Sequence, residues 1–190
     1  MKKFIDESWL VLVLGAVFAV LLAGAQTSFS GRIKENQDRA LNEAIGQVVP
    51  GTERSELIPI DGYDRNVFKC QGPDGRVAGW AIDAVGLGFA DKVRLVIGLS
   101  ADAGTITGIK VIDNVETPGL GNKIAGEGED AWPEQFRGLK AAAKVVRVKQ
   151  KRNVEHNEIQ AITGATISSD AVTKIVNDAI QRVRSKLPTP

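Results

Sequence analysis

The sequence predicts an α+β fold, in which an antiparallel sheet with flanking helices is preceded by one N-terminal transmembrane helix. The chain starts with a long uncharged apolar run, and its middle alternates short apolar segments with turns that contain Gly or Pro. Its last part has apolar residues at helical spacing. Short strands joined by tight turns favour antiparallel pairing. With 190 residues, the chain has room for one soluble domain and one further element.

The apolar run lies in Ser8–Gly31, which carries no charged residue, and Trp9–Ala25 within it is continuously apolar. As a helix, the uncharged run would extend roughly 36 Å, enough to cross a hydrocarbon core of about 30 Å. A cleaved signal peptide is the alternative, because Ala23-Gly24-Ala25 resembles a cleavage site. The length of the run favours a retained single-pass anchor. We therefore expect three regions: an N-terminus of residues 1–8, a transmembrane helix of residues 9–30 and a soluble domain of residues 31–190.

The soluble part is expected to begin with a helix over Arg32–Val48 that continues from the membrane helix and ends before Pro50-Gly51. A short helix is expected over Trp132–Leu139, and a last helix over Ser168–Ser185. Strands are expected in five apolar segments: Val67–Cys70, Arg76–Ile82, Val93–Leu99, Thr105–Ile112 and Ala143–Val148.

The composition excludes several classes of function. The 24 basic and 23 acidic residues are balanced, whereas a general nucleic-acid binder would be clearly basic. Cys70 is the one cysteine, so an intrachain disulfide and a multi-cysteine metal site are excluded, and we expect a small buried side chain there. His156, the one histidine, cannot build a zinc site alone and is expected at the surface. We predict no catalytic and no metal-ligating residues.

One segment of the soluble part is strongly basic. Arg137–Arg152 contains seven basic residues and no acidic residue. The simpler interpretation is a solvated strand face, with Val145, Val146 and Val148 pointing inward. The alternative is a patch that binds acidic lipid headgroups or an acidic partner surface.

A tight turn with Gly164 precedes the last expected helix, and hydroxyl side chains surround it: Thr163, Thr166, Ser168 and Ser169. Ser168, Ser169 and Asp170 are of the types that cap a helix or lie in its first turn. A helix N-terminus offers unpaired backbone N–H groups and the positive end of the helix dipole, which suits a phosphate. A well-capped helix without any ligand is the alternative.

Two further segments are rich in turn residues. Glu116-Thr117-Pro118-Gly119-Leu120-Gly121 follows the Thr105–Ile112 strand, and its proline and two glycines predict a structured turn. Gly86-Leu87-Gly88-Phe89 precedes the Val93–Leu99 strand.

These segments together resemble the FMN-binding domain family. Thr163-Gly164-Ala165-Thr166, followed by Ile-Ser-Ser, is similar to the family's flavinylation motif, and Glu116–Gly121 matches its E-T-P-G-L-G loop. Gly86–Phe89 is a weaker match to a Gly-x-Gly-Phe segment. Where the family usually has Asp three residues before the motif, this sequence has Gln160. The resemblance extends from about Gly86 to Val176.

The resemblance implies that Thr166 carries FMN through a phosphoester bond to its side-chain oxygen. In the loop, glycine lets the backbone approach a flat ring, Leu120 can pack on the ring face, and Glu116 can bond a polar flavin edge. The further residues expected at the cofactor are Thr163, Gly164, Ala165, Ser168, Ser169, Thr117, Pro118, Gly119 and Gly121.

The same resemblance implies a function in electron transfer. The length is similar to the G-subunit family of Rnf complexes, so covalent FMN is expected to relay electrons within an ion-translocating ferredoxin:NAD oxidoreductase. The alternatives are the C-subunit family of sodium-translocating NADH:quinone reductases and a tethered module with non-covalent FMN. The expected partners are other membrane subunits, a flavin transferase and the lipid bilayer. The charges that flank the apolar run are nearly balanced, so the resemblance alone suggests an inner-membrane protein with a cytoplasmic N-terminus and its domain on the extracytoplasmic (periplasmic) side.

Overall fold

The computed structural model describes residues 2–188. Its first element, α1, is one continuous helix over Lys2–Val48, so the predicted membrane helix and the first helix of the domain form a single element. By packing, the chain divides into two units, Met1–Ala40 and Leu41–Pro190. The last turns of α1 therefore belong to the second unit, and the predicted region boundaries at residues 8 and 30 stay predictions.

The first unit contains the apolar part of α1. Within the described residues, one helical segment, Ser8–Val48, is long and apolar enough to cross a membrane, and the mean hydropathy of its apolar window is 2.4. None of that window is buried in the protein. An isolated helix with exposed apolar side chains suits a lipid environment.

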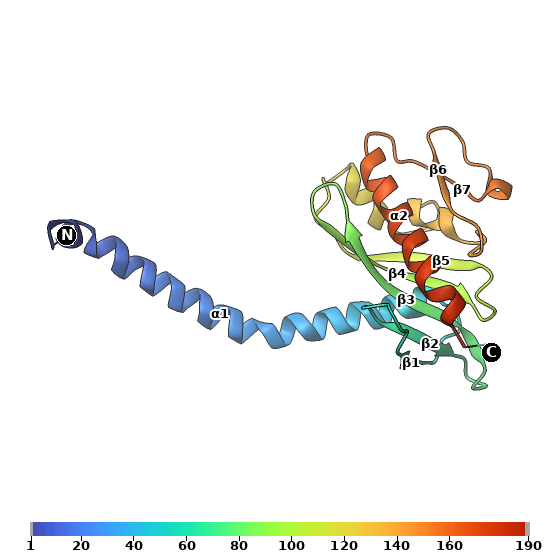
Figure 1. The fold of residues 1–190 in the computed structure, drawn as a ribbon, viewed down its shortest axis with the longest axis horizontal. Helices are drawn as coiled ribbons and strands as arrows, with labels where there is room; N and C mark the ends of the chain where they lie inside the picture. Colours follow the sequence, from blue (N-terminus) through green and yellow to red (C-terminus); the bar gives the residue numbers. More distant parts are fainter. Residues whose placement is uncertain (1, 189–190) are drawn as a thin grey trace. The chain divides into compact units, whose positions relative to one another are not determined.

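The second unit is built on an antiparallel meander of five strands (Figure 1). These strands follow one another in the sheet as in the sequence: β1 (Arg54–Ile58), β2 (Val67–Gln71), β3 (Val77–Leu87), β4 (Lys92–Ser100) and β5 (Ile106–Asp113). The predicted antiparallel sheet is confirmed. β1 was not predicted, because its residues Arg-Ser-Glu-Leu-Ile are mostly polar and four of the five are exposed.

Two short strands form a separate parallel pair, β6 (Val146–Val148) and β7 (Glu158–Gln160). β6 is shorter than the predicted strand Ala143–Val148, and the three-residue β7 was not predicted. Val145 is buried, but Val146 is 44% exposed, so the prediction that Val146 points inward was wrong. The strand begins only at Val146, after the buried Val145, so the three valines do not share one strand face.

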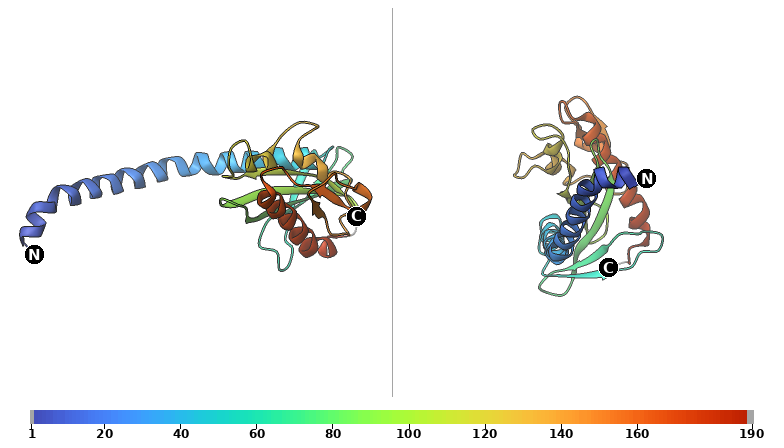
Figure 2. Two further views of the ribbon diagram at one scale, coloured as in Figure 1. Left: turned by 90° about the horizontal axis from the view of Figure 1, so that it is seen from above. Right: turned by 90° about the vertical axis from the view of Figure 1, so that its left-hand side faces the viewer.

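A helix covers each face of the sheet. α2 (Thr166–Val183) lies across one face, over the larger core that includes Trp80, Leu95 and Ile106. The end of α1 packs on the other face in a smaller cluster with Cys70, Ala81 and Val96. Figure 2 shows α2 and the last turns of α1 on opposite sides of the strands. As expected, Cys70 is fully buried and His156 is exposed.

The remaining elements are short 3-10 helices: η1 (Gly121–Ala125), η2 (Trp132–Phe136), η3 (Val154–His156) and η4 (Arg184–Lys186). η2 replaces the longer helix predicted over Trp132–Leu139. Pro133 lies at the start of η2, and Gly138 has a φ of 83°, which ends any helix before Leu139.

Candidate functional site

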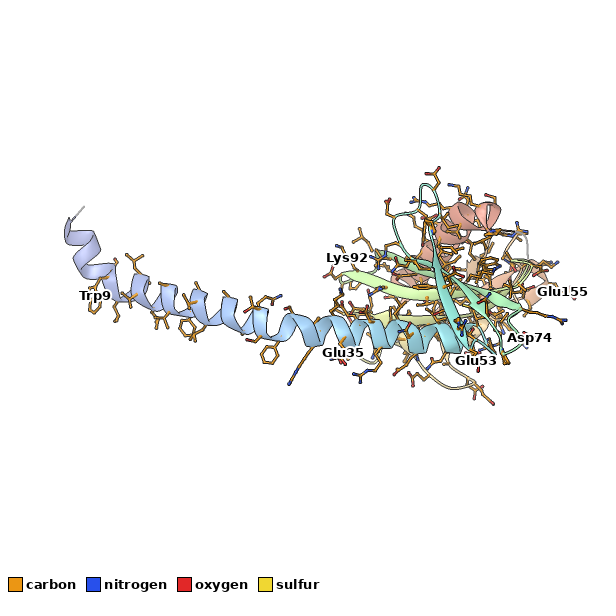
Figure 3. All side chains as sticks on the ribbon, turned by 90° about the horizontal axis from the view of Figure 1, so that it is seen from below. Trp9, Glu35, Glu53, Asp74, Lys92 and Glu155 are labelled. Carbon is orange, nitrogen blue, oxygen red and sulfur yellow. The ribbon has the colours of Figure 1, made fainter. Side chains whose placement is uncertain are left out.

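The three turn-rich segments of the sequence meet at one end of the sheet. The β3–β4 turn lies there, next to Lys92, whereas Asp74 marks the opposite end (Figure 3). β5 runs antiparallel to β4, and Arg94, near the start of β4, pairs with Asp113, the last residue of β5. The loop that follows β5 therefore leaves the sheet at the same end as the β3–β4 turn, so topology brings the first two segments together.

Glu116 connects all three segments through its carboxylate, and its residue surface is only 5% exposed. Oε1 accepts hydrogen bonds from the backbone N–H groups of Phe89 (2.6 Å) and Ala90 (3.2 Å) in the β3–β4 turn. Oε2 accepts a hydrogen bond of 2.6 Å from the hydroxyl of Ser168, in the first turn of α2. One side chain of the post-β5 loop therefore reaches both of the other segments.

Two glycines make room for this carboxylate. A Cβ atom on Gly88 would collide with Glu116 Oε1 and would lie 2.8 Å from the backbone oxygen of Asp91. A Cβ atom on Gly121 would lie 2.7 Å from Glu116 Oε2 and 2.8 Å from Ser168 Oγ. Real Cβ atoms do not approach other atoms so closely, so a side chain at Gly88 would collide with backbone as well as with Glu116, and one at Gly121 would force Glu116 or Ser168 to shift.

The Thr163-Gly164 segment forms a tight turn between β7 and α2. The N–H of Ala165 donates to the carbonyl of Ile162 (3.0 Å), and Gly164 at the third position has a φ of 82°, as a type II turn requires. Gly164 also faces the post-β5 loop, because a Cβ atom there would lie 3.2 Å from Leu120 Cδ2. The two motifs that carry the family resemblance are therefore in contact.

The backbone that enters this turn is held by η2. The indole N–H of Trp132 donates to the carbonyl of Gln160 (2.7 Å), and the N–H of Gln160 donates to Gln135 Oε1 (2.8 Å). The side chain of Gln160 is exposed. Sequence reasoning missed Trp132 and Gln135, since 25 or more residues separate them from Gln160 and no local pattern connects them.

α2 begins at Thr166, two residues earlier than predicted, and its N-cap residue is Ala165, with no side-chain capping bond. The serines therefore do not cap the helix, but they do lie in its first turn, as the sequence also predicted. The Ser169 hydroxyl instead donates to the carbonyl of Ala165 (2.9 Å) and accepts from the N–H of Ile162 (3.0 Å). These bonds tie the first turn of α2 back to the preceding turn, which fixes the direction in which the helix starts.

The four hydroxyl groups around the turn fall into two classes. Ser168 and Ser169 are buried and bonded to the protein. Thr163 is exposed and Thr166 half-buried, and no hydroxyl bond of either is found within residues 8–188, whose side chains the structure describes. Over the same residues, every buried side-chain nitrogen or oxygen has a partner, so the free hydroxyl of Thr166 is accessible to solvent.

The start of α2 also has free backbone donors. No described residue accepts a hydrogen bond from the N–H groups of Thr166, Ile167 or Ser168, and the first helical bond is that of Ser169 to Ala165 (3.1 Å). Asp170 does not compete for these donors, because Arg147 binds both of its oxygens at 2.6 and 2.9 Å. These hydrogen bonds raise the pKa of the Arg147 guanidinium above its ordinary value.

Apolar side chains are exposed beside each of the three segments. Phe89 is 63% exposed, Leu120 45% and Ile167 57%. Phe89 is bonded to the carboxylate of Glu116 through its N–H group. Leu120 and Ile167 are the sequence neighbours of Gly121 and Ser168, which both lie against that carboxylate. The site therefore combines an accessible hydroxyl, free N–H groups and apolar surface. Among the residues that the structure describes, this site included, no group of three His, Cys, Asp or Glu side chains has the arrangement of a metal site.

Three of the seven basic side chains in Arg137–Arg152 are bonded within the protein, two of them to carboxylates. Arg137 pairs with Glu134 at 2.8 Å and Arg147 with Asp170, and Arg152 donates to the carbonyl of Gln135 (2.5 Å). The four lysines of the segment, Lys140, Lys144, Lys149 and Lys151, are exposed. This arrangement favours the simpler interpretation of a solvated surface.

Comparison with known proteins identifies the family. Residues 88–181 match the FMN-binding domain. The chain is 35% identical over 186 residues to the G subunit of the Na⁺-translocating ferredoxin:NAD⁺ oxidoreductase complex of Acetobacterium woodii, covering 90% of this chain and 87% of the relative. It is 30% identical over 184 residues to the G subunit of the ion-translocating oxidoreductase complex of Methanosarcina acetivorans, covering 93% and 92% of the two chains.

Among solved structures, the fold is similar to the C subunit of the Na⁺-translocating NADH-quinone reductase from Parabacteroides distasonis. The TM-score is 0.64 at 18% identity, over 84% of this chain and 98% of that one. At this identity the likeness shows a shared fold only, whereas the G-subunit relatives match in sequence over nearly their whole length. The chain therefore belongs to the G-subunit family of ion-translocating oxidoreductase complexes, and residues 88–181 are its FMN-binding domain.

Proposed function

We propose that this protein carries FMN as a phosphoester on Thr166 and relays electrons between other subunits of a membrane-bound, ion-translocating complex. The observation that carries the proposal is the state of the hydroxyl groups in the first turn of α2. Ser168 and Ser169 are buried and bonded, whereas the hydroxyl of Thr166 is free and accessible within the described structure. Within the first turn of α2, Thr166 thus has the hydroxyl that is available to become an ester, and it lies beside the free N–H groups of the helix start, whereas the free hydroxyl of Thr163 precedes the helix.

The residues present fit a phosphate ester at this position. A phosphodiester retains one negative charge, and the free N–H groups of Thr166, Ile167 and Ser168 lie at the positive end of the helix dipole. The nearest acidic side chain in the helix, Asp170, is neutralised by Arg147. The donor set therefore favours an anion at the start of α2.

The apolar surface fits the ring system. Leu120 contacts the turn at Gly164, and the exposed side chains of Phe89 and Ile167 flank the same place. Flat aromatic ligands bind to apolar and aromatic side chains with few polar contacts. We assign the positions close to the cofactor to Thr163, Gly164, Ala165 and the loop Thr117-Pro118-Gly119-Leu120-Gly121.

Attachment requires an activated FMN donor and an enzyme that transfers it. The bond formed joins Thr166 Oγ1 to the phosphorus. With a flavin dinucleotide as donor, the bond broken is its pyrophosphate link, and the hydroxyl proton and a nucleoside monophosphate leave. The protein thereby gains the mass of FMN less one water. The exposed side chain of Gln160 lies beside the turn and is available for contact with such a flavin transferase.

The bound flavin would supply reversible one- and two-electron redox chemistry, and the protein supplies position and surroundings. The names of the relatives describe subunits of complexes that couple a ferredoxin:NAD⁺ reaction to ion translocation. We therefore propose other subunits of such a complex as the electron donor and acceptor. We further propose that α1 anchors the chain in the bilayer with its domain on the extracytoplasmic side.

The test of attachment is the intact mass of the denatured full-length protein, made in a host that has a flavin transferase. A mass gain of one FMN less one water, mapped to the peptide that contains Thr166, is expected. Thr166→Ala should abolish the gain, and the control variant Ser185→Ala, which removes an exposed hydroxyl outside the site, should keep it. An unmodified mass, in a host that modifies a known flavinylated protein, would overturn the covalent proposal. Flavin that is released on denaturation would then indicate a non-covalent FMN module.

The relay is tested separately. Membranes that contain the assembled complex with Thr166→Ala should lose ferredoxin-dependent NAD⁺ reduction while the other subunits remain present. Unchanged activity would contradict the relay even if FMN is bound.

A further inference from the structure

We propose that Glu116 is a positioning residue that holds the three segments of the flavin site together, instead of a ligand that binds the flavin ring. The proposal rests on the FMN function proposed above, and it assigns to Glu116 a role that differs from the direct contact expected from the family resemblance.

The hydrogen bonds of the carboxylate support this role. A carboxylate only accepts hydrogen bonds, at about four lone-pair positions. Glu116 already accepts three, from two backbone N–H groups and one hydroxyl, and its residue surface is 5% exposed. Little of its acceptor capacity therefore remains for a ligand outside the protein.

The contacts of Glu116 are distant in sequence. Phe89 lies 27 residues before Glu116, and Ser168 lies 52 residues after it. The segments also meet directly, at Leu120 and Gly164 and at Gly121 and Ser168, but Glu116 is the side chain that bonds to both of the other segments. Hydrogen bonds to an ionised acceptor are stronger than neutral ones, so Glu116 is well suited to hold such loops.

The steric fit around the carboxylate is an independent observation. Gly88 and Gly121 come from two of the joined segments, and neither position has space for a Cβ atom beside the Glu116 oxygens. The backbone thus closes directly around the carboxylate from two sides. Such packing fixes the two carboxylate oxygens in place. A side chain that had to turn toward a ligand would need space around its oxygens instead.

The consequence is that one buried group sets the positions of the exposed apolar residues at the flavin. Phe89 is bonded to the carboxylate directly, Leu120 precedes Gly121, and Ile167 precedes Ser168. Thr166 is two residues from the Ser168 hydroxyl. If the carboxylate is lost, we expect the surface that receives the ring to loosen while the sheet and α2 stay folded.

Three substitutions separate positioning from charge. In Glu116→Gln, the amide oxygen can accept from Phe89 and Ala90, and the NH₂ group can donate to the Ser168 oxygen, so the connection is kept without the charge. Glu116→Asp keeps the charge but is one methylene too short to reach both partners. Glu116→Ala removes both and leaves buried donors without partners.

The first measurement is amide hydrogen exchange of the Phe89–Ala90 segment in the full-length protein that also carries Thr166→Ala and therefore no covalent flavin. We expect exchange that is about tenfold faster or more in the Ala and Asp variants, because loss of buried hydrogen bonds shifts local opening by at least such a factor. The Gln variant keeps both connections through weaker neutral hydrogen bonds, so its exchange rate should lie much closer to the parent rate than that of the Asp variant. Unchanged exchange in the Asp variant would overturn the proposal, and this variant keeps the test decisive if the Ala variant does not fold.

The second measurement is the fluorescence anisotropy of FMN attached to Thr166 in the flavinylated protein. Positioning predicts a high anisotropy in wild type and Gln, and a lower one in Asp. A Gln variant that is as loose as Asp would overturn the proposal, because it would show that the charge acts on the flavin. Asp91→Asn is the control, since it removes an exposed charge of the same turn without touching Glu116. If Thr166 is not flavinylated, the exchange measurement can still be made, because it uses protein without covalent flavin. That result would count against the proposed function and not against the role of Glu116.

Discussion

Arg94 forms a bidentate ion pair with Asp83, in which Nε of Arg94 lies 2.9 Å from Oδ1 of Asp83 and Nη2 of Arg94 lies 3.0 Å from Oδ2. Asp83 is only 1% exposed, and its Oδ2 also accepts a hydrogen bond of 2.9 Å from Arg65. The two residues lie on adjacent strands, where Val85 pairs with Arg94 and Asp83 with Val96. The ion pair therefore joins β3 to β4 close to the turn that contacts Glu116.

Asp83→Ala should destabilise the protein by about 1.5–3 kcal/mol, because it removes a buried acceptor of charge-assisted hydrogen bonds from Arg65 and Arg94, whose guanidinium groups are partly exposed. Chemical denaturation of the full chain in mild detergent measures the change. The control is Asp74→Ala, which breaks an exposed ion pair with Arg76 at 3.6 Å and should alter stability by about 1 kcal/mol or less. Equal effects of the two substitutions would contradict a structural role for the buried pair.

The comparison of sequence and structure shows which features a sequence pattern can predict. β2 to β5 were predicted because their apolar residues follow one another within a short segment of sequence. The turn around Gly164 was predicted for the same reason, since Gly and the hydroxyl residues lie close together in the sequence. Glu116 was predicted at the site, but its partners were not, since Phe89 and Ser168 are fixed only when distant loops fold together. Asp83 gave no signal, because a charged residue in a strand usually faces solvent.

The error at the start of α2 has a similar cause. Ser168 and Ser169 follow the usual pattern of capping residues, but tertiary contacts use their hydroxyls. Ser168 donates to Glu116, and Ser169 bonds to Ile162 and Ala165. The helix consequently extends back to Thr166 and leaves that hydroxyl free. The feature that distinguishes Thr166 from its neighbours thus depended on the tertiary structure.

Gly121→Ala should destabilise the domain by about 1–3 kcal/mol, the usual effect of overpacking, because its Cβ would lie 2.7 Å from Glu116 Oε2. The matched control is Gly46→Ala, which adds the same methyl group at a helical position with no neighbouring atom within 4 Å. This control should stabilise α1 by about 0.5–1 kcal/mol. Thermal unfolding of both variants measures the difference, and a Gly121→Ala protein as stable as wild type would show that the contact can relax.

Glu116→Ala should partly relieve the effect of Gly121→Ala, since it removes the oxygen that the new methyl group meets. We expect the double variant to be less destabilised than the sum of the two single variants. Denaturation of all four proteins of this cycle measures the coupling. Strict additivity would indicate that Ser168 Oγ, at 2.8 Å, is the atom that excludes the methyl group.

Stability should fall with rising pH through the ionisation of Cys70. Burial raises the pKa of this thiol from 9.0 to about 11. In the unfolded chain the thiol loses its proton near pH 9, and in the folded chain only near pH 11, so rising pH favours the unfolded state within this window. The contribution is fully present below pH 9. Denaturation midpoints of wild type and Cys70→Ala should keep a constant difference up to pH 9 and then converge or cross, and a difference that stays constant to pH 11 would contradict the prediction.

The last turns of α1 should be required for the soluble domain to fold. Leu41, Ala44, Ile45 and Val48 in α1, with Val49 directly after it, supply most of the cluster on the second face of the sheet. Thr107 Oγ1 donates to the carbonyl of Val48, and Gly98 has no space for a Cβ atom beside that carbonyl. Burial of each large apolar side chain contributes about 1.5–3 kcal/mol, so their combined loss would approach the about 5–15 kcal/mol of a whole domain.

Two fragments test this requirement. A chain of residues 41–190 keeps the second unit whole and should be soluble, with one cooperative unfolding transition. A chain of residues 51–190 differs by ten residues but exposes Cys70, Ala81 and Val96, so it should bind hydrophobic dyes, aggregate and unfold without a clear transition. Dye fluorescence, light scattering and thermal melts compare the two. Equal melting temperatures would show that the sheet does not depend on the end of α1, and that the cut between anchor and domain can lie as late as residue 50.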